Sequence, residues 1–282
     1  MIFPRVSVIG SGTMGHGIAH VAAGAGSSVL LYDIDAERVA AAIQKITANL
    51  NKGVEKGKVS AADRDATLGR IRGVTVLSEA AEADLVIEAI PERIELKTDL
   101  FVALDARASA GTVFATNTSS LSVAAIGATL RDPSRLVGLH FFNPVHLMPL
   151  LEVVVHAGTS PEVAEKARQF GAEIGKECIT VRDSPGFASS RLGIALGMEA
   201  IRMLEEGVAS AEDIDKAMVL GYRHPVGPLR LTDMVGLDVR LAIGEYLFEK
   251  LGNPSFNPPE LLRRMVAEGR LGAKVGKGFY RW

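Results

Sequence analysis

The chain opens with a short apolar run, Val6–Ile9, that leads directly into a glycine-rich turn. In such a turn the first glycine allows a tight bend, the second lets a pyrophosphate approach the backbone, and the third lets the following helix pack closely. Free N–H groups at the start of that helix attract phosphate charge. A three-glycine turn alone is weak evidence, but a strand before it and a helix after it predict a dinucleotide site. The turn consists of Gly10, Ser11, Gly12, Thr13, Met14 and Gly15.

An acidic residue, Asp33, ends a second apolar run, Val29–Tyr32, and lies 18 residues after Gly15. At this spacing a carboxylate accepts hydrogen bonds from the adenosine ribose hydroxyls and repels a 2′-phosphate. No arginine follows Asp33 directly. The sequence therefore favours NAD over NADP as the cofactor.

One histidine and one carboxylate have the pattern of a proton-transfer pair. His140 lies near the end of the apolar run Arg135–Phe141, and Glu152 is the single charge within the apolar run Leu150–Val155. A carboxylate inside a strand is costly unless it is paired. A histidine held by a carboxylate has a fixed tautomer and a stabilised imidazolium. On pattern alone, a purely structural pair explains these residues about equally well.

The other potential ligands and nucleophiles are weaker. His16 and His20 are four residues apart on the first expected helix, but no third ligand accompanies them, so we expect no metal site. The single cysteine, Cys178, begins the apolar run Cys178–Val181, where a buried structural thiol is expected.

Between Lys45 and Arg72 the sequence holds seven basic residues against three acids, although the net charge of the chain is −2. This excess suits a polyphosphorylated ligand, while a solvated helical face explains it equally well on composition alone. The basic residues are Lys45, Lys52, Lys56, Lys58, Arg64, Arg70 and Arg72.

Apolar strands alternate with helices through the first two-thirds of the chain, which predicts an α/β fold with a Rossmann-type, mostly parallel sheet. From Pro185 the pattern contains helices only, so the expected boundary is Asp183–Gly186. We expect residues 1–184 to bind NAD and to include a helical arm at about 36–72, and residues 185–282 to form an all-α domain. Further expected strands are Val74–Leu77, Asp84–Ile90 and Thr112–Thr116; expected helices are Ala36 to about Arg70, Arg93–Ala108, Val123–Leu130, Pro161–Ile174, Phe187–Glu206, Ala211–Leu220, Val239–Leu251 and Pro259–Glu268.

Of the 282 residues, 48% are hydrophobic and 23% charged, as in an ordinary globular protein. The slightly negative net charge argues against nucleic-acid binding. No apolar run approaches the ~18 residues of a membrane span, and the first strand begins too early for a signal peptide. A cytoplasmic protein is expected.

Five segments resemble the short-chain L-3-hydroxyacyl-CoA dehydrogenases, most closely the bacterial 3-hydroxybutyryl-CoA dehydrogenases. The resemblance covers essentially the whole chain, and its His-Phe-Phe-Asn-Pro block is highly specific. It implies an oxidoreductase of fatty acid metabolism that interconverts L-3-hydroxyacyl-CoA and 3-oxoacyl-CoA with NAD. It also implies a homodimer joined largely through the C-terminal domain. The segments are Gly10–Gly15, Asn117–Leu121, Gly138–Pro144, Asp183–Phe187 and Gly276–Tyr280.

By this resemblance His140 is the general acid/base, Glu152 is its carboxylate partner, and Ser119 contacts both the substrate hydroxyl and the nicotinamide. The coenzyme A contacts fall on the arm near Asn49 and Lys56, in agreement with the basic excess there. The cofactor contacts fall on the glycine turn and on Asp33, Glu92, Lys97, Ser119, Asn143 and Lys274.

One position departs from the family pattern. Where the family has an asparagine near the substrate carbonyl, this chain has Ser190, which is shorter and offers fewer hydrogen bonds. Either a water fills the gap or the pocket suits another acyl group. Two alternative functions are a dehydrogenase of a 3-hydroxyacid without CoA and a cofactor-binding homologue with reduced activity. The basic arm argues against the first, and His140 with Glu152 argues against the second.

Overall fold

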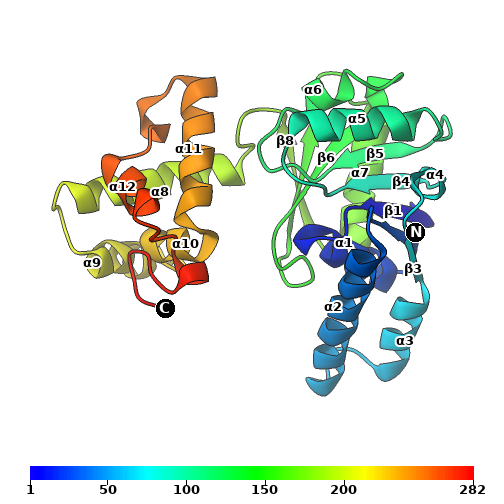
Figure 1. Ribbon diagram of the computed structural model, residues 1–282, viewed down its shortest axis with the longest axis horizontal. Coiled ribbons are helices and arrows are strands. Elements are labelled where there is room, and N and C mark those ends of the chain that lie inside the picture. The colour runs from blue at the N-terminus through cyan, green and yellow to red at the C-terminus, as the bar shows by residue number, and fades with distance from the viewer. The chain divides into compact units, whose positions relative to one another are not determined.

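The computed structural model describes residues 1–282, which divide into two compact units, Met1–Asp183 and Ser184–Trp282 (Figure 1). The first unit contains one eight-stranded sheet, and the second is helical. This arrangement confirms the predicted α/β, Rossmann-type fold class. The strands are β1 (Arg5–Ile9), β2 (Ser28–Tyr32), β3 (Ile71–Val74), β4 (Leu85–Glu88), β5 (Val113–Thr116), β6 (Leu136–Phe141), β7 (Leu150–Val155) and β8 (Glu177–Arg182).

The strand order is β3-β2-β1-β4-β5-β6-β7-β8, and every neighbouring pair is parallel except β6 and β7. The chain order reverses direction between β1 and β4. In open α/β sheets a ligand binds in the crevice outside the carboxyl ends of the strands at such a reversal. The glycine turn follows β1 at this edge and leads into helix α1 (Thr13–Ala25).

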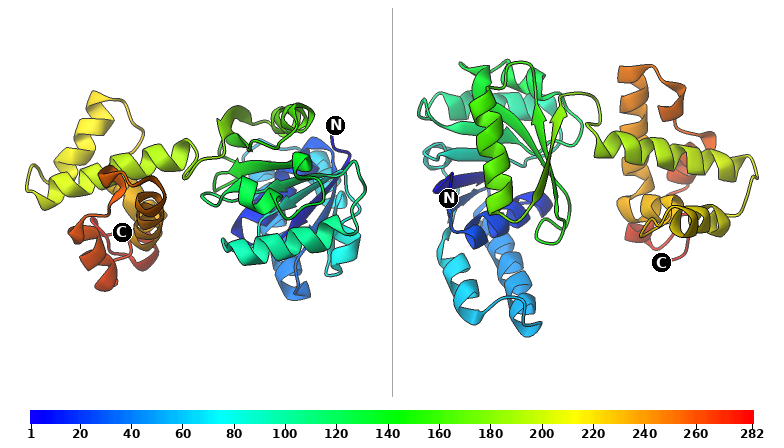
Figure 2. Two further views of the ribbon diagram at one scale, coloured as in Figure 1. Left: turned by 90° about the horizontal axis from the view of Figure 1, so that it is seen from above. Right: turned by 180° about the vertical axis from the view of Figure 1, so that it is seen from behind.

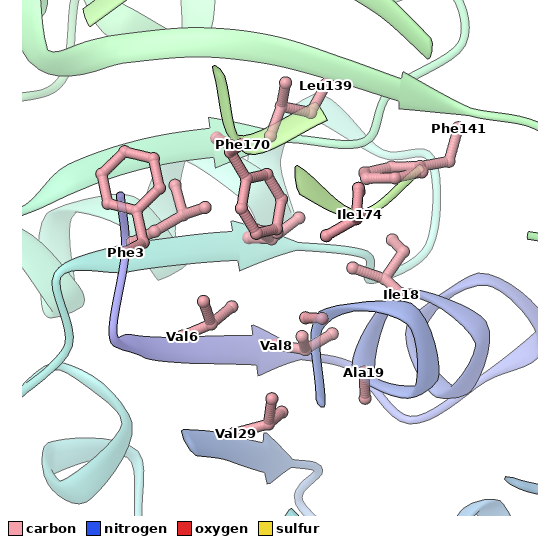
Figure 3. Packing of buried hydrophobic residues seen from close by; sticks show 14 of the residues in the cluster. Phe3, Val6, Val8, Ile18, Ala19, Val29, Leu139, Phe141, Phe170 and Ile174 are labelled. Carbon is pink, nitrogen blue, oxygen red and sulfur yellow. The ribbon is translucent and has the colours of Figure 1, made fainter. Parts of the chain in front are cut away.

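Both faces of the sheet are covered. Val8 of β1 packs with Ile18 of α1 and with Phe170 of α7 (Pro161–Glu173), so these two helices share one face (Figure 3). Side chains alternate along a strand, and Phe114 of β5 therefore points to the other face. There it meets Phe101 of α5 (Ile94–Asp105) edge-on, with ring centroids 5.8 Å apart.

The predicted long helix after Asp33 is in fact two helices, α2 (Ala36–Glu55) and α3 (Ala61–Gly69). The chain turns between them at Gly57, whose φ of +64° lies in the left-handed region that ends helices. Ser60 then begins α3, because its Oγ accepts a hydrogen bond from the N–H of Asp63 at 3.0 Å. The two helices lie side by side and extend beyond the sheet as an arm (Figures 1 and 2).

Three further elements differ from the sequence prediction. The strand expected at Val74–Leu77 is β3, and the short helix α4 (Leu77–Ala80) follows it. The run that contains Cys178 is the edge strand β8, where the thiol is half-buried and burial raises its pKa. In the helical unit, α10 (Pro228–Val235) was not predicted. The short helix α6 (Val123–Gly127) matches its expected start.

The helical unit has its own core, which contains Ile194, Met198, Leu229 and Leu247. Buried Asp233 of α10 accepts hydrogen bonds from the N–H groups of Phe279 and Tyr280 and from the indole of Trp282, and so fixes the end of the chain. None of the helices combines the length and apolar character that crossing a bilayer requires. The remaining helices are α8 (Ser189–Glu205), α9 (Ala211–Lys216), α11 (Leu237–Leu251) and α12 (Glu260–Ala267).

Candidate active site

The antiparallel pairing of β6 and β7 places His140 directly opposite Glu152. His140 Nδ1 lies 2.6 Å from Glu152 Oε2, the carboxylate is fully buried, and the histidine is 7% exposed. Since β6 runs parallel to β5, its carboxyl end lies at the same edge of the sheet as the glycine turn. The carboxylate therefore fixes the tautomer and orientation of an imidazole at the edge where ligands bind.

Ser119 follows β5 and is held by a carboxylate from the neighbouring loop. Glu92 Oε1 accepts hydrogen bonds from Thr118 Oγ1 at 2.5 Å, from the N–H of Ser119 at 2.9 Å and from Ser119 Oγ at 3.3 Å. The side chain of Asn117 accepts a hydrogen bond from the N–H of Phe141 at 2.9 Å, which joins the ends of β5 and β6. Ser119 thus follows β5, and His140 lies near the end of the adjacent strand β6.

Next to this loop, one buried ammonium group pairs with two carboxylates. Lys97 of α5 is 1% exposed, and its Nζ lies 2.6 Å from Glu88 Oε1 and 3.2 Å from Glu92 Oε2. Burial acts to raise the pKa of Glu92, but Lys97 and the hydrogen bonds from Thr118 and Ser119 together hold that pKa below its usual value. Burial raises the pKa of Glu88 even though Lys97 opposes the change.

Sequence reasoning missed Glu88. The signal that identified Glu152, a lone carboxylate within an apolar strand, is also present at Glu88 in β4 (Leu85–Glu88). Its partner Lys97 comes from a helix and not from a neighbouring strand. The spacing of apolar residues therefore gave no sign of the partner.

The glycine turn has the geometry that a dinucleotide requires. A Cβ at Gly15 would lie 1.7 Å from the carbonyl oxygen of Gly10, so only glycine allows α1 to pack this closely. A Cβ at Gly12 would meet no atom within 4 Å, because this glycine faces open space. The turn thus presents bare backbone to a cavity of about 740 Å³, which its residues line together with Asp33. The residues present fit NAD.

Asp33 is organised by the same turn. Its Oδ2 accepts hydrogen bonds from the N–H and the Oγ of Ser11, at 2.9 and 2.8 Å. Sequence reasoning considered only the residue directly after Asp33 and missed Arg38, whose NH1 lies 4.0 Å from Asp33 Oδ1. Arg38 also lines the cavity. The carboxylate of Asp33 therefore has a neighbouring cation.

The other predicted site residues belong to other segments of the chain. Asn143 is exposed in the loop after β6. Half-buried Asn49 and exposed Lys56 lie at the far end of α2, whose 20 residues span about 30 Å. Ser190 and Lys274 belong to the helical unit, where Lys274 Nζ lies 2.6 Å from both carboxylate oxygens of Asp238.

Three other histidines, His16, His20 and His146, lie on or beside α1. The imidazole of His16 contacts the carbonyl oxygen of Gly12 at 2.8 Å within its own helix. His20 stacks on His146 with ring centroids 5.4 Å apart, and burial lowers the pKa of His20 to about 4. No group of three or more histidine, cysteine or acidic side chains is arranged to hold a metal ion.

Comparison with known proteins identifies relatives along the whole chain. Residues 5–184 match the NAD-binding domain model of 3-hydroxyacyl-CoA dehydrogenase, and residues 186–282 match the model of its C-terminal domain. The chain is 41% identical over 278 residues to a 3-hydroxybutyryl-CoA dehydrogenase of Mycobacterium tuberculosis, which covers 98% of this chain and 97% of that protein. It is 45% identical over 278 residues to the 3-hydroxyadipyl-CoA dehydrogenase of Escherichia coli, which covers 98% of this chain and 58% of that protein.

A solved structure shows the same similarity. The crystal structure of (S)-3-hydroxybutyryl-CoA dehydrogenase from Ralstonia eutropha superposes with a TM-score of 0.96 at 38% identity, and the match covers 99% of both chains.

Proposed function

This chain belongs to the 3-hydroxyacyl-CoA dehydrogenase family and is an NAD-dependent oxidoreductase, and we propose that it acts on L-3-hydroxyacyl-CoA thioesters of short acyl chain. The observation that carries the proposal is the buried pair of His140 and Glu152 at the carboxyl edge of the sheet. The names of the two relatives, one acting on a hydroxybutyryl and one on a hydroxyadipyl thioester, support the substrate class.

In the oxidative direction His140 takes the proton of the substrate 3-hydroxyl through Nε2, since Nδ1 is engaged by Glu152. Glu152 stabilises the imidazolium that forms. NAD, when bound, would supply the acceptor for the hydride of C3 in oxidation, and NADH would supply the hydride in reduction. In the reductive direction the same imidazolium returns its proton to the 3-oxo group.

Other residues bind and orient. Ser119 positions the substrate oxygen, and Glu92 with Lys97 fixes the loop from which Ser119 extends. The glycine turn and Asp33 hold the adenosine and pyrophosphate parts of NAD. Asn143 and Lys274 are further cofactor contacts, and Ser190 takes the place of an asparagine beside the acyl group. Asn49 and Lys56 are the proposed contacts to coenzyme A.

The test is NADH oxidation with acetoacetyl-CoA, followed by absorbance. His140→Ala should lower kcat by about 10²- to 10⁴-fold. Glu152→Gln should also lower kcat, by a large part of that factor. Both variants should bind NADH as the unmodified protein does, because neither residue belongs to the glycine turn. His224→Ala, in the helical unit, is the matched control and should keep full activity. The proposed role of His140 is wrong if His140→Ala keeps more than about a tenth of kcat.

Two further properties complete the proposal. We propose that two copies associate through residues 185–282, since that unit exposes large apolar side chains such as Leu192, Leu220 and Tyr222. Light scattering of the full chain should give twice the mass of one chain. We also propose a cytoplasmic location, where the single half-buried thiol stays reduced. Fractionation of the native host should recover the activity with the cytoplasmic proteins.

A further inference from the structure

The carboxylate of Glu88 is buried next to the cavity that the glycine turn lines. Glu88 ends β4 and is paired in register with Ile9, the residue before Gly10 of the turn. An ideal Cβ at Gly10 would lie 2.7 Å from the carbonyl oxygen of Ala89, so the backbone after Glu88 packs directly against the turn. Ala89 and Ile90 line the cavity. Glu88, which is fully buried, therefore comes immediately before a segment of the cavity wall.

Each hydrogen bond to the carboxylate of Glu88 comes from a donor. Its Oε1 accepts from the N–H of Ile90 at 2.7 Å and from Lys97 Nζ at 2.6 Å, and its Oε2 accepts from Thr116 Oγ1 at 2.6 Å. A hydroxyl donor at this distance is typical of an ionised acceptor. Burial opposes the charge, but three donors, one of them a buried ammonium group, supply what a buried carboxylate requires. The contacts therefore favour the ionised form of Glu88.

The cluster of Glu88, Lys97 and Glu92 holds more negative than positive charge. Lys97 is the only basic residue that forms an ion pair with either carboxylate. Its ammonium group and the hydrogen bonds from the neighbouring loop keep the pKa of Glu92 below its usual value, so Glu92 is ionised as well. Two carboxylates against one ammonium group leave one net negative charge. Salt screens this charge only weakly, because Glu88 and Lys97 are buried.

The strand order decides which half of the cofactor lies over this cluster. Asp33 follows β2, on one side of β1 and the glycine turn, and is the residue that faces the adenosine ribose under the proposed function. His140 lies on β6, on the other side of β1, and hydride transfer must take place near it. β4 and β5 lie between β1 and β6, so we expect the nicotinamide half over their carboxyl ends. Those ends carry Glu88 and its hydrogen-bond donor Thr116.

The two redox states of the cofactor differ by one charge in this half. The nicotinamide ring is positively charged in NAD⁺ and neutral in NADH, and the remaining groups have the same charge in both. A fixed negative charge near the ring therefore stabilises the oxidised form relative to the reduced one.

We propose that Glu88 gives the buried cluster its net negative charge and thereby strengthens the binding of NAD⁺ relative to that of NADH. The inference rests on the proposed function, which sets the nicotinamide between the glycine turn and His140. It makes Glu88 a residue that acts on the cofactor through charge, without lining the cavity itself.

The test is isothermal titration calorimetry of the full chain with NAD⁺ and with NADH. Glu88→Gln keeps the size of the side chain and removes its charge, so the ratio of Kd for NAD⁺ to Kd for NADH should rise at least about fivefold. Glu88→Met removes the same charge and should raise the ratio in the same way if Glu88→Gln does not fold. Glu82→Gln, at an exposed residue just before the opposite end of β4, changes the net charge equally and should leave the ratio unchanged.

A second variant separates charge from structure. Glu88→Gln/Lys97→Met removes one charge of each sign and leaves Glu92 as the single charge of the cluster. The ratio should therefore return to about the value of the unmodified protein, although two buried positions are changed. A purely structural Glu88 would instead weaken both cofactors together, in the single variant and more so in the double one, and would leave the ratio constant throughout.

The inference is overturned if removal of the Glu88 charge leaves the ratio unchanged or lowers it. It is also overturned if the double variant keeps the ratio of the single variant, since the change would then not follow the charge of the cluster. Failure of the unmodified protein to bind either cofactor would instead reject the proposed function, on which the inference rests.

Discussion

At the scale of single residues, a carboxylate inside an apolar strand was the most useful signal. Glu152 and Glu88 both show it, but only the partner of Glu152 was predictable. His140 lies on the adjoining strand, and a short loop between two strands makes cross-strand pairing probable from spacing. Lys97 reaches Glu88 from a helix whose placement depends on the whole sheet. The glycine turn and Asp33 could likewise be identified from the sequence, because their spacing depends only on one strand, one turn and one helix.

We propose that cofactor choice depends on Asp33 and on Arg38, which lies beside it. The unmodified protein should favour NADH over NADPH in kcat/KM by at least about tenfold, since the carboxylate repels a 2′-phosphate. Asp33→Ala should reduce the ratio of kcat/KM for NADH to that for NADPH, mainly by weakening NADH binding. Arg38 lines the cavity and carries a positive charge. The double variant Asp33→Ala/Arg38→Ala should therefore bind NADPH more weakly than Asp33→Ala alone. Steady-state kinetics and fluorescence titration measure both effects, and equal use of the two cofactors by the unmodified protein would contradict the assignment.

At the scale of elements, periodicity identified the strands that are buried and the helices that are long. It failed where tertiary pairing decides the structure. β3 contains Arg72 and Gly73, and β8 is a largely exposed edge strand, so neither has the apolar character of a central strand. The break between α2 and α3 was also hidden, because both helices keep an apolar stripe and only a brief turn at Gly57 separates them.

The arm formed by α2 and α3 is open to a direct test. If it binds the phosphates of coenzyme A, Lys56→Ala should raise KM for acetoacetyl-CoA several-fold while KM for NADH stays nearly constant. The effect should decrease as salt is raised, because an exposed phosphate contact is screened within about 10 Å at 0.1 M salt. Lys166→Ala on α7 removes a charge outside the arm and serves as the control. An unchanged acyl-CoA KM at low salt would show that the basic face is only solvated.

At the scale of the whole molecule, buried ion pairs link stability to pH. Burial acts to raise the pKa of Asp105, but hydrogen bonds from Arg131 and Arg135 hold it below its usual value. A pKa that is lower in the folded state adds stability above the unfolded value of about 3.9. That contribution is lost as pH falls through the folded value.

Asp105→Asn should therefore lower the free energy of unfolding at pH 7 by about 1–3 kcal/mol, since two arginines lose a charged acceptor. The difference from the unmodified protein should diminish as pH falls below about 4, where the carboxylate of Asp105 is protonated in the unfolded chain but still charged in the folded one. Urea unfolding at pH 7 and at pH 3 measures both. Asp65→Asn, at an exposed pair with Arg64, should leave the free energy of unfolding almost unchanged. Equal effects of the two substitutions would contradict the role of Asp105.

The ladder between β6 and β7 has an evolutionary consequence. Because backbone hydrogen bonds along both strands set His140 against Glu152, the connecting segment 142–149 does not determine their alignment. Insertions or deletions in that segment after Asn143 and Pro144 are therefore compatible with proton transfer, and descendants of this chain can vary this part to admit new ligands. One residue inserted within β6 or β7 would instead turn His140 or Glu152 to the opposite face of the sheet. Natural variation should thus accumulate in the second half of the loop and be rare in the strands beside it.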